Sequence, residues 1–212
     1  MSVLLAFAAA LAALPCAAYW VPAPPPPGAL VKEYDAEKVK RIDLRADAGL
    51  VRLEPVTGPL LTAIVVRRDA GTCRVEAFFR EGRLTLSVVE KAPASPLGGA
   101  GRCPAELTLR LPRAVELSAA TGSAPIEGEA LKGPVRLRTG SGSVRLLWET
   151  APRGLVEVET GSGRVELVFP SGTRADASLA SGSGAVFDEL TPDRRAKLRV
   201  RVRSGSGDVV MR

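Results

Sequence analysis

Two segments of the chain decide the fold: VRLRTGSGSVRL at Val135–Leu146 and VEVETGSGRVEL at Val156–Leu167, which lie 21 residues apart. In both segments, apolar residues alternate with charged residues on either side of a central Thr-Gly-Ser-Gly. This alternation is typical of two short, half-buried strands, and the sequence between them indicates a turn or corner. Related corners begin at Thr121, Ser181 and Ser204, so the C-terminal half of the chain is an internal repeat.

The repeat is less regular toward the N-terminus. Two degenerate copies, each with Asp-Ala-Gly at the corner, span Ile42–Leu53 and Ile64–Val75. Phe78–Leu86 predicts a β-hairpin with Glu-Gly at its turn. A Pro/Gly-rich loop at Ala92–Gly101 and a strand at Leu107–Leu111 follow it. We therefore expect an irregular, antiparallel hairpin segment in the middle of the repeat array.

The charges of neighbouring repeats distinguish a parallel β-solenoid from an antiparallel meander of hairpins. Three arginines of one repeat stand where the next repeat has glutamates: Arg136, Arg138 and Arg145 against Glu157, Glu159 and Glu166. A meander would place like charges opposite one another, whereas stacked coils place each arginine over a glutamate, which contributes about 0.2–1 kcal/mol per pair. The charges therefore favour an all-β fold, namely a single-stack parallel β-solenoid (β-helix-like) with coils of about 21 residues.

The corner of each coil consists of small residues. Glycine reaches positive φ without penalty, and a serine hydroxyl can hydrogen-bond a neighbouring backbone group at a corner. We therefore assign a structural role at the corners to Gly122, Gly140, Gly142, Gly161, Gly163, Gly182, Gly184, Gly205 and Gly207, and to Ser123, Ser141, Ser162, Ser183 and Ser206.

The composition excludes several kinds of chemistry. The chain of 212 residues contains no histidine, which rules out Ser-His-Asp and Cys-His catalysis and histidine-based metal sites. Its 3 cysteines are too few for an all-thiolate zinc site. With 21 glycines, 17 prolines and only 4% aromatic residues, the chain favours a turn-rich β architecture over a helical bundle. We expect no catalytic, cofactor-binding or metal-binding residues and no cofactor.

The N-terminus predicts export. Residues 1–31 carry no charged side chain, and Val3–Ala18 is an apolar run that indicates a signal peptide or an N-terminal membrane anchor over residues 1–18. Cys16 leaves lipidation as a further alternative. A Pro-rich linker at 19–39 precedes the repeat domain at 40–212, whose regular coils span 115–212. All these alternatives predict an exported chain that is periplasmic, membrane-anchored or at the cell surface.

Two cysteines remain beyond the apolar run, Cys73 and Cys103. An even number of cysteines in an exported protein suggests a disulfide, so this pair is a disulfide candidate.

The repeat domain resembles a known bacterial family. Strands with short Gly-containing corners, then Leu109-Arg110-Leu111-Pro112, then repeated Ser-Gly corners followed by Val-x-Leu, are similar to the putative-adhesin family of domains of unknown function. The resemblance covers roughly residues 40–212. It implies an extracytoplasmic, β-solenoid-like domain with an adhesin-like role, and it brings no catalytic residues. The chain departs from the family in its richness in arginine and in its two internal cysteines.

One stretch of the chain is strongly basic, in a protein of net charge +6. Its basic residues are the candidate contacts to an anionic polymer: Arg194, Arg195, Lys197, Arg199, Arg201 and Arg203. The alternative is that these charges protect the exposed end of the stack from edge-to-edge aggregation. Nucleic acid is disfavoured as a partner, because no aromatic residues interleave with the basic ones to stack on bases.

These observations predict a non-catalytic envelope protein, an adhesin-like binding or structural module that contacts an anionic envelope polymer or surface glycan. The first alternative is an envelope-stress or signalling accessory domain that binds an envelope protein. The second is a carbohydrate-active β-helix enzyme, for which Asp188, Glu189 and Asp193 supply the carboxylates. We expect contact with a membrane only through the N-terminal segment.

Overall fold

The computed structural model describes residues 24–25, 27–56, 59–67, 73–90, 103–129 and 131–212. The predicted signal segment, Cys16 and the Ala92–Gly101 loop lie outside these residues. The described part of the chain forms 18 strands and no helix. The all-β class expected from the sequence is therefore confirmed.

The strands form two sheets of nine strands each. The first sheet has the order β1 (Leu30–Asp35), β4 (Leu60–Arg67), β7 (Pro104–Pro112), β3 (Ala48–Val56), β9 (Ile126–Glu129), β11 (Val144–Leu147), β13 (Val165–Val168), β18 (Val209–Met211) and β15 (Val186–Asp188). The second has the order β16 (Thr191–Pro192), β14 (Arg174–Ser181), β17 (Leu198–Ser204), β12 (Gly154–Thr160), β10 (Val135–Thr139), β8 (Glu116–Thr121), β2 (Arg41–Ala46), β6 (Arg83–Glu90) and β5 (Cys73–Arg80).

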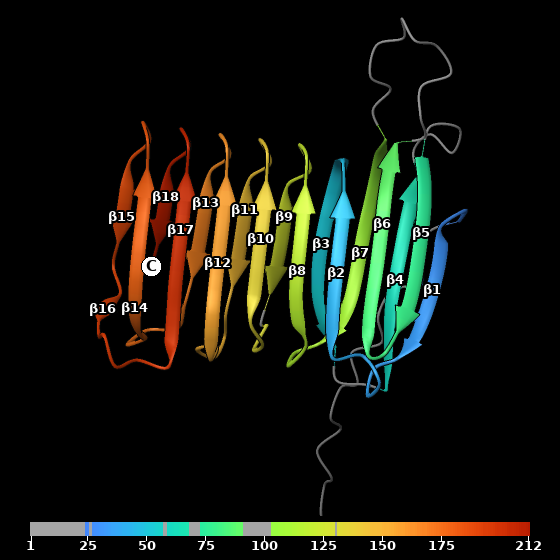
Figure 1. The fold of residues 1–212 in the computed structure, drawn as a ribbon, viewed down its shortest axis with the longest axis horizontal. Coiled ribbons are helices and arrows are strands. Elements are labelled where there is room, and N and C mark those ends of the chain that lie inside the picture. Colours follow the sequence, from blue (N-terminus) through green and yellow to red (C-terminus); the bar gives the residue numbers. More distant parts are fainter. Residues whose placement is uncertain (1–23, 26, 57–58, 68–72, 91–102, 130) are drawn as a thin grey trace, which may run out of the picture.

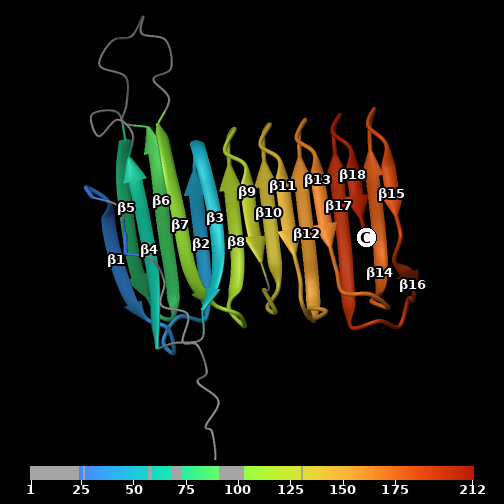
Figure 2. The same ribbon diagram turned by 180° about the vertical axis from the view of Figure 1, so that it is seen from behind.

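The two sheets lie face to face as two layers (Figures 1 and 2), and their inward side chains form one core that is mostly aliphatic. Both sheets are mixed: β1–β4, β4–β7 and β5–β6 pair antiparallel, and the other pairs are parallel. Neither sheet closes on itself. The architecture is thus two open mixed sheets, and it differs from the expected single parallel stack in the antiparallel strands at one end.

The regular repeats pair in the register that their charges predict. Strand β10 lies parallel to β12, with Arg136 beside Glu157 and Arg138 beside Glu159. Strand β11 lies parallel to β13, with Arg145 beside Glu166. The antiparallel meander is therefore wrong for these strands.

Alternation along each strand places every second side chain in the core. In β10 the side chains of Val135 and Leu137 are buried while the arginines between them are exposed, and β12 repeats the pattern with Val156 and Val158. Each fully buried valine or leucine stabilises the fold by about 1.5–3 kcal/mol relative to an exposed one. A shift of one residue in register would turn all of these side chains out, so burial and charge pairing select the same register.

The spatial order of the repeats differs from their order in the chain at both ends. The last repeat, β17–β18, lies between β12–β13 and β14–β15 (Figure 1). In the same way, β2–β3 lies between β6–β7 and β8–β9. The basic strand β17 is therefore an interior strand. The interpretation of its arginines as protection of an exposed edge is wrong, because β17 has a neighbour on each side.

The N-terminal part of the chain departs from the predicted repeat. The copy expected at Ile64–Val75 is not a coil, because β4 pairs antiparallel with β7 and β5 pairs antiparallel with β6. The hairpin expected around Glu81 and Gly82 is present as β5–β6, with φ of 52° and 79° at these two residues. Positive φ at both central residues is the turn geometry that matches the twist of a hairpin.

A disulfide links the two sheets near this end. Cys73 begins β5 in the second sheet, and Cys103 precedes β7 in the first. The structure joins their sulfur atoms, with 5.0 Å between the two Cα atoms. The bond covalently ties an edge strand to the opposite layer.

The corners require small residues because neighbouring corners stack closely on one another. None of the repeated corner glycines has positive φ, which corrects the expectation drawn from glycine's conformational freedom. A methyl group on Gly163 would instead collide with the carbonyl of Gly142 in the neighbouring corner. At four corners the first residue supplies a capping hydroxyl: Thr139, Thr160, Ser181 and Ser204 each accept a hydrogen bond from the backbone N–H three residues later. At the fifth corner the hydroxyl of Thr121 donates to the carbonyl of Ala124.

The serines in the middle of the corners have no such role. Among the described residues, the side chains of Ser123, Ser141, Ser162, Ser183 and Ser206 make no hydrogen bond. The hydrogen-bonding role expected for these serines thus belongs to the preceding Thr or Ser.

Candidate functional site on the outer face of the second sheet

The basic strand β17 presents three arginines to solvent. Arg199, Arg201 and Arg203 are exposed, and they alternate with the buried side chains of Val200 and Val202. Because the strand lies between β12 and β14, these arginines lie on the outer face of the second sheet and not at its edge.

The other three basic candidates are not on this strand. Arg194, Arg195 and Lys197 lie in the exposed turn before β17, where the backbone N–H of Arg195 donates a hydrogen bond to Asp193 at 2.9 Å. The structure therefore brings together three of the six basic residues singled out from the sequence and leaves the other three at the margin of the face.

Carboxylates from β12 separate two columns of arginine. Glu157 lies in register between Arg136 and Arg201, and Glu159 lies in register between Arg138 and Arg203. The ion pairs form on the β10 side, with Arg138 Nε 2.9 Å from Glu159 Oε2 and Arg136 Nε 3.6 Å from Glu157 Oε2. Within the described residues, no carboxylate lies within ion-pairing distance of the arginines of β17.

The arginines reach further into solvent than the glutamates beside them. The side chain of Arg138 is 72% exposed, whereas that of Glu159 is 36% exposed. Arginine is the longer side chain and carries its charge at the tip. The outermost layer of this face is therefore cationic, and the carboxylates lie beneath it.

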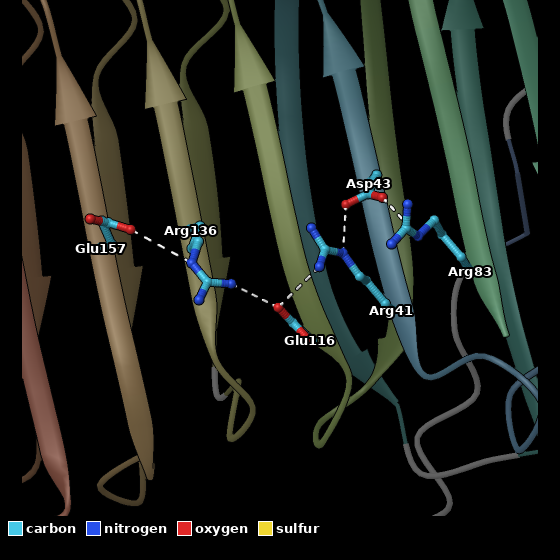
Figure 3. A network of polar contacts seen from close by, with 6 residues as sticks. All are labelled: Arg41, Asp43, Arg83, Glu116, Arg136 and Glu157. Atoms are coloured by element: carbon cyan, nitrogen blue, oxygen red, sulfur yellow. Dashed lines mark hydrogen bonds and ion pairs between the residues drawn. The ribbon is translucent and has the colours of Figure 1, made fainter.

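A network of ion pairs continues this pattern toward β6. Figure 3 shows its members: Arg41, Asp43, Arg83, Glu116, Arg136 and Glu157. Glu116 Oε1 lies 2.8 Å from Arg136 Nη1 and 3.5 Å from Arg41 Nη1, so one carboxylate on β8 connects the strands on both of its sides, β10 and β2. The hydrogen bond from Arg41 to Asp43 raises the pKa of Arg41. Networks of several charges contribute more than isolated surface pairs, so these residues stabilise the sheet.

Shallow hollows lie beside Arg201 and Arg203 of β17. Arg203 lines three of them, with volumes of about 430, 200 and 330 Å³. The first extends over the corners of four neighbouring strands and is bordered by Arg138 and Glu159. These hollows are open to solvent, which suits an extended ligand lying on the surface better than an enclosed small molecule.

The outer face of the first sheet has a different charge pattern. Its hollow of about 680 Å³ is lined by carboxylates and guanidinium groups together: Glu54, Glu127, Glu129 and Glu149 with Arg52, Arg113 and Arg145. On β13 of this face, Glu166 accepts a hydrogen bond from Arg212, and this bond together with the charge of Arg145 lowers the pKa of the glutamate. Mixed charge of this kind gives the first sheet no preference for an anionic ligand.

The aspartates considered for a carbohydrate-active enzyme form hydrogen bonds with nearby backbone groups. The oxygens of Asp188 and Asp193 accept hydrogen bonds from the backbone N–H groups of Leu190 and Arg195, two residues along the chain in each case. Asp208 accepts a hydrogen bond from the N–H of Ala185 in the neighbouring corner. The described residues contain no cluster of three or more metal-ligating side chains, and no helix among them is long and apolar enough to cross a membrane.

Sequence reasoning missed two features that depend on stacking. Arg136 and Arg138 join the candidate face because β10 lies two strands from β17, although they were singled out only as partners of glutamates. Trp148 and Phe169 stack with ring centroids 4.4 Å apart in the core. Their separation of 21 residues, which equals the repeat, was the signal that could have found the aromatic pair.

The fold has counterparts among solved structures. A putative cell adhesion protein from Clostridium sporogenes superposes with a TM-score of 0.64 at 14% sequence identity, over 86% of this chain and 97% of that one. The chain shares the fold of that protein. The resemblance drawn from the sequence is thereby supported at the level of the fold.

Two further structures resemble the chain more weakly. They are a putative adhesin from Bacteroides fragilis (TM-score 0.34, 9% identity, 89% of this chain and 99% of that one) and a putative lipid binding protein from Parabacteroides distasonis (TM-score 0.28, 13% identity, 86% and 96%). No protein family and no curated protein matches the sequence.

Proposed function

We propose that the chain is a non-catalytic, adhesin-like module of the bacterial envelope that contacts an anionic polymer through the outer face of the second sheet. The observation that carries this proposal is the position of Arg199, Arg201 and Arg203 in the interior of the sheet, exposed and without ion-pair partners among the described residues. An interior strand needs no charges to prevent edge pairing, so these arginines are available for a ligand.

The disulfide supports a location outside the cytoplasm, since disulfides persist in oxidising compartments. The apolar N-terminal segment supports export in the same way, as a cleaved signal, a lipid anchor or an uncleaved anchor. The adhesion name of the structural neighbour from Clostridium sporogenes agrees with a binding role. We further propose that residues 115–212 act as β-solenoid coils, supported by their parallel, in-register pairing.

The test measures binding of the purified full-length chain to isolated bacterial envelopes across a salt series. Charge-driven contacts at a surface weaken as salt screens them. We expect binding to fall with rising salt and to be reduced in the triple variant Arg199→Ser/Arg201→Ser/Arg203→Ser.

A triple variant on the opposite face is the matched control. Arg52→Ser/Arg145→Ser/Arg212→Ser removes the same charge from the first sheet, and we expect it to bind as the wild type does. Thermal unfolding of both variants verifies that they are folded. Binding that is indifferent to salt and to the β17 triple variant would contradict the proposal and would direct the search to a protein partner.

A further inference from the structure

Three arginines of the second sheet lie in one register row across the strands. We call this set, Arg203, Arg138 and Arg45, the arginine comb. Along this row, crossing the strands, lie Arg203 on β17, Glu159 on β12, Arg138 on β10, Ala120 on β8 and Arg45 on β2. The three arginines are exposed and occupy every second strand, while the glutamate between two of them is half-buried. Adjacent strands are about 4.8 Å apart, so the positive charges repeat at intervals of about 10 Å.

The neighbouring row does not continue in this way. It contains Arg201, Glu157 and Arg136 but ends at Asp43 on β2. Arg136 is also engaged by two carboxylates, since Glu116 lies 2.8 Å away and Glu157 lies 3.6 Å away. The row of Arg203, Arg138 and Arg45 is thus the one that presents three evenly spaced cations. Its middle residue, Arg138, pairs with a single carboxylate, so further N–H donors of its guanidinium group are available to a ligand.

A hollow follows the same direction as this row. It is the space of about 430 Å³ that crosses β8, β10, β12 and β17, bordered by Arg138 and Arg203. The corner glycines Gly140, Gly161 and Gly205 line it. Because these residues lack side chains, an extended chain that crosses the strands can lie close to the backbone beside the comb.

We propose that this comb binds a linear acidic polysaccharide with one carboxylate on every second sugar, running across the strands. This inference rests on the proposed function and names its ligand class. Such a polymer has a charge repeat of the same order as the arginine repeat, so its carboxylates meet arginines and its neutral sugars pass over Glu159 and Ala120. A nucleic acid strand carries a charge about every 3.4 Å and would set phosphates against the glutamate.

The experiment uses two polymers of different charge spacing. Hyaluronan carries one carboxylate per disaccharide, and polygalacturonate carries one on every sugar. We expect the full-length chain to bind hyaluronan oligosaccharides more tightly than polygalacturonate at equal carboxylate concentration. The affinity for hyaluronan rises with length up to a hexasaccharide, whose three carboxylates match the three arginines, and rises little beyond it.

Two variants with the same change in charge, one in the arginine row and one on the opposite sheet, separate the effect of charge spacing from that of total charge. We expect Arg138→Ser to weaken hexasaccharide binding by about fivefold and to abolish the preference for hyaluronan. Arg52→Ser, on the first sheet with the same change in charge, keeps both the preference and the length dependence. Equal binding of both polymers, or equal effects of the two variants, overturns the spacing inference and leaves the proposed function standing. If neither polysaccharide binds in low salt, the spacing inference is overturned, and if the chain also fails to bind isolated envelopes, the proposed function is overturned as well.

Discussion

Arg203 lies in register beside Glu159, although the two residues belong to repeats that are not consecutive in the chain. Glu159 pairs with Arg138 on its other side, and its ion pair of 2.9 Å is with that residue. The glutamate therefore neutralises one neighbour and leaves the other to the solvent. This asymmetry leaves exposed positive charge, unpaired among the described residues, on a face where arginine and glutamate alternate.

Removing the carboxylate between the arginines should strengthen binding. We expect Glu159→Gln to increase affinity for an acidic polysaccharide by about two- to fivefold at low salt, because a repulsive charge beneath the ligand is lost. Titration calorimetry measures the change. Glu127→Gln, on the opposite sheet, is the control and leaves the affinity unchanged. A weakened interaction in Glu159→Gln would show that the glutamate positions Arg138 instead of opposing the ligand.

The stacked corners should not tolerate a side chain at Gly163. A methyl group there would collide with the carbonyl of Gly142, and overpacking of this kind costs about 1–3 kcal/mol. We therefore expect Gly163→Ala to lower the free energy of unfolding by that amount in a urea titration. Ser162→Ala, at the exposed neighbouring position, should change stability by less than about 0.5 kcal/mol. Comparable stability of the two variants would contradict the close stacking.

The capping hydroxyl of Thr160 should be replaceable only by serine. Its oxygen accepts a hydrogen bond from the N–H of Gly163 at 2.9 Å, and Thr160 is buried. We expect Thr160→Val to destabilise the fold by about 1–3 kcal/mol, because a buried donor loses its acceptor. Thr160→Ser should restore most of the stability, since Ser204 makes the equivalent bond to Gly207. Thermal unfolding compares the two, and equal losses would argue against a capping role.

The pH dependence of stability should include a contribution from Glu166. Its pKa is lowered first by the hydrogen bond from Arg212 and further by the charge of Arg145. A carboxyl whose pKa is lower in the folded chain stabilises the fold above the unfolded pKa of about 4.3, and this contribution is lost as the pH falls through the folded pKa. We expect Arg212→Gln to raise the pKa of Glu166.

Carbon-detected NMR titration of the glutamate carboxyl follows this change directly. The stability difference between wild type and Arg212→Gln should be present at neutral pH and should vanish as the pH falls below the folded pKa of Glu166. Arg174→Gln, on β14 of the other sheet, is the control, and the pKa of Glu166 stays at its wild-type value in that variant.

The last repeat should hold the preceding one in place. Strands β14 and β15 reach the rest of their sheets only through β17 and β18. We expect deletion of residues 198–212 to abolish the hydrogen-exchange protection of residues 174–188, although these residues remain in the chain. Strands β10 and β11, whose partners are intact, keep their protection. Persistent protection at 174–188 would contradict the observed strand order.

The sequence predicted the strands and their local register, because alternation and complementary charge are visible in each pair of repeats. It could not predict the order of the repeats. Glu157 and Glu159 complement Arg136 and Arg138 as well as they complement Arg201 and Arg203, so the charge pattern fits either neighbour. The apolar faces of the repeats are also alike, so burial does not discriminate between them.

The sequence also misjudged the N-terminal copy at Ile64–Val75. The alternating apolar residues of this copy are compatible with a parallel or an antiparallel strand. In the structure, β4 pairs antiparallel with β7, and β5 pairs antiparallel with β6. The candidate site could therefore be predicted only in part from the sequence. The basic stretch was recognisable, but its combination with Arg138 and Arg45 depends on which strands lie beside it.

The exchanged repeats at both ends restrict how a chain of this kind changes in length over evolution. From β8 to β13, position in the chain and position in the sheets run together, so a duplicated or deleted repeat leaves all other neighbours unchanged. A repeat added after β18 would have to find a place beyond β15, apart from the strand that precedes it. Gene duplication is thus accommodated most readily in the centre of the array, and each repeat gained there would widen each sheet by one strand.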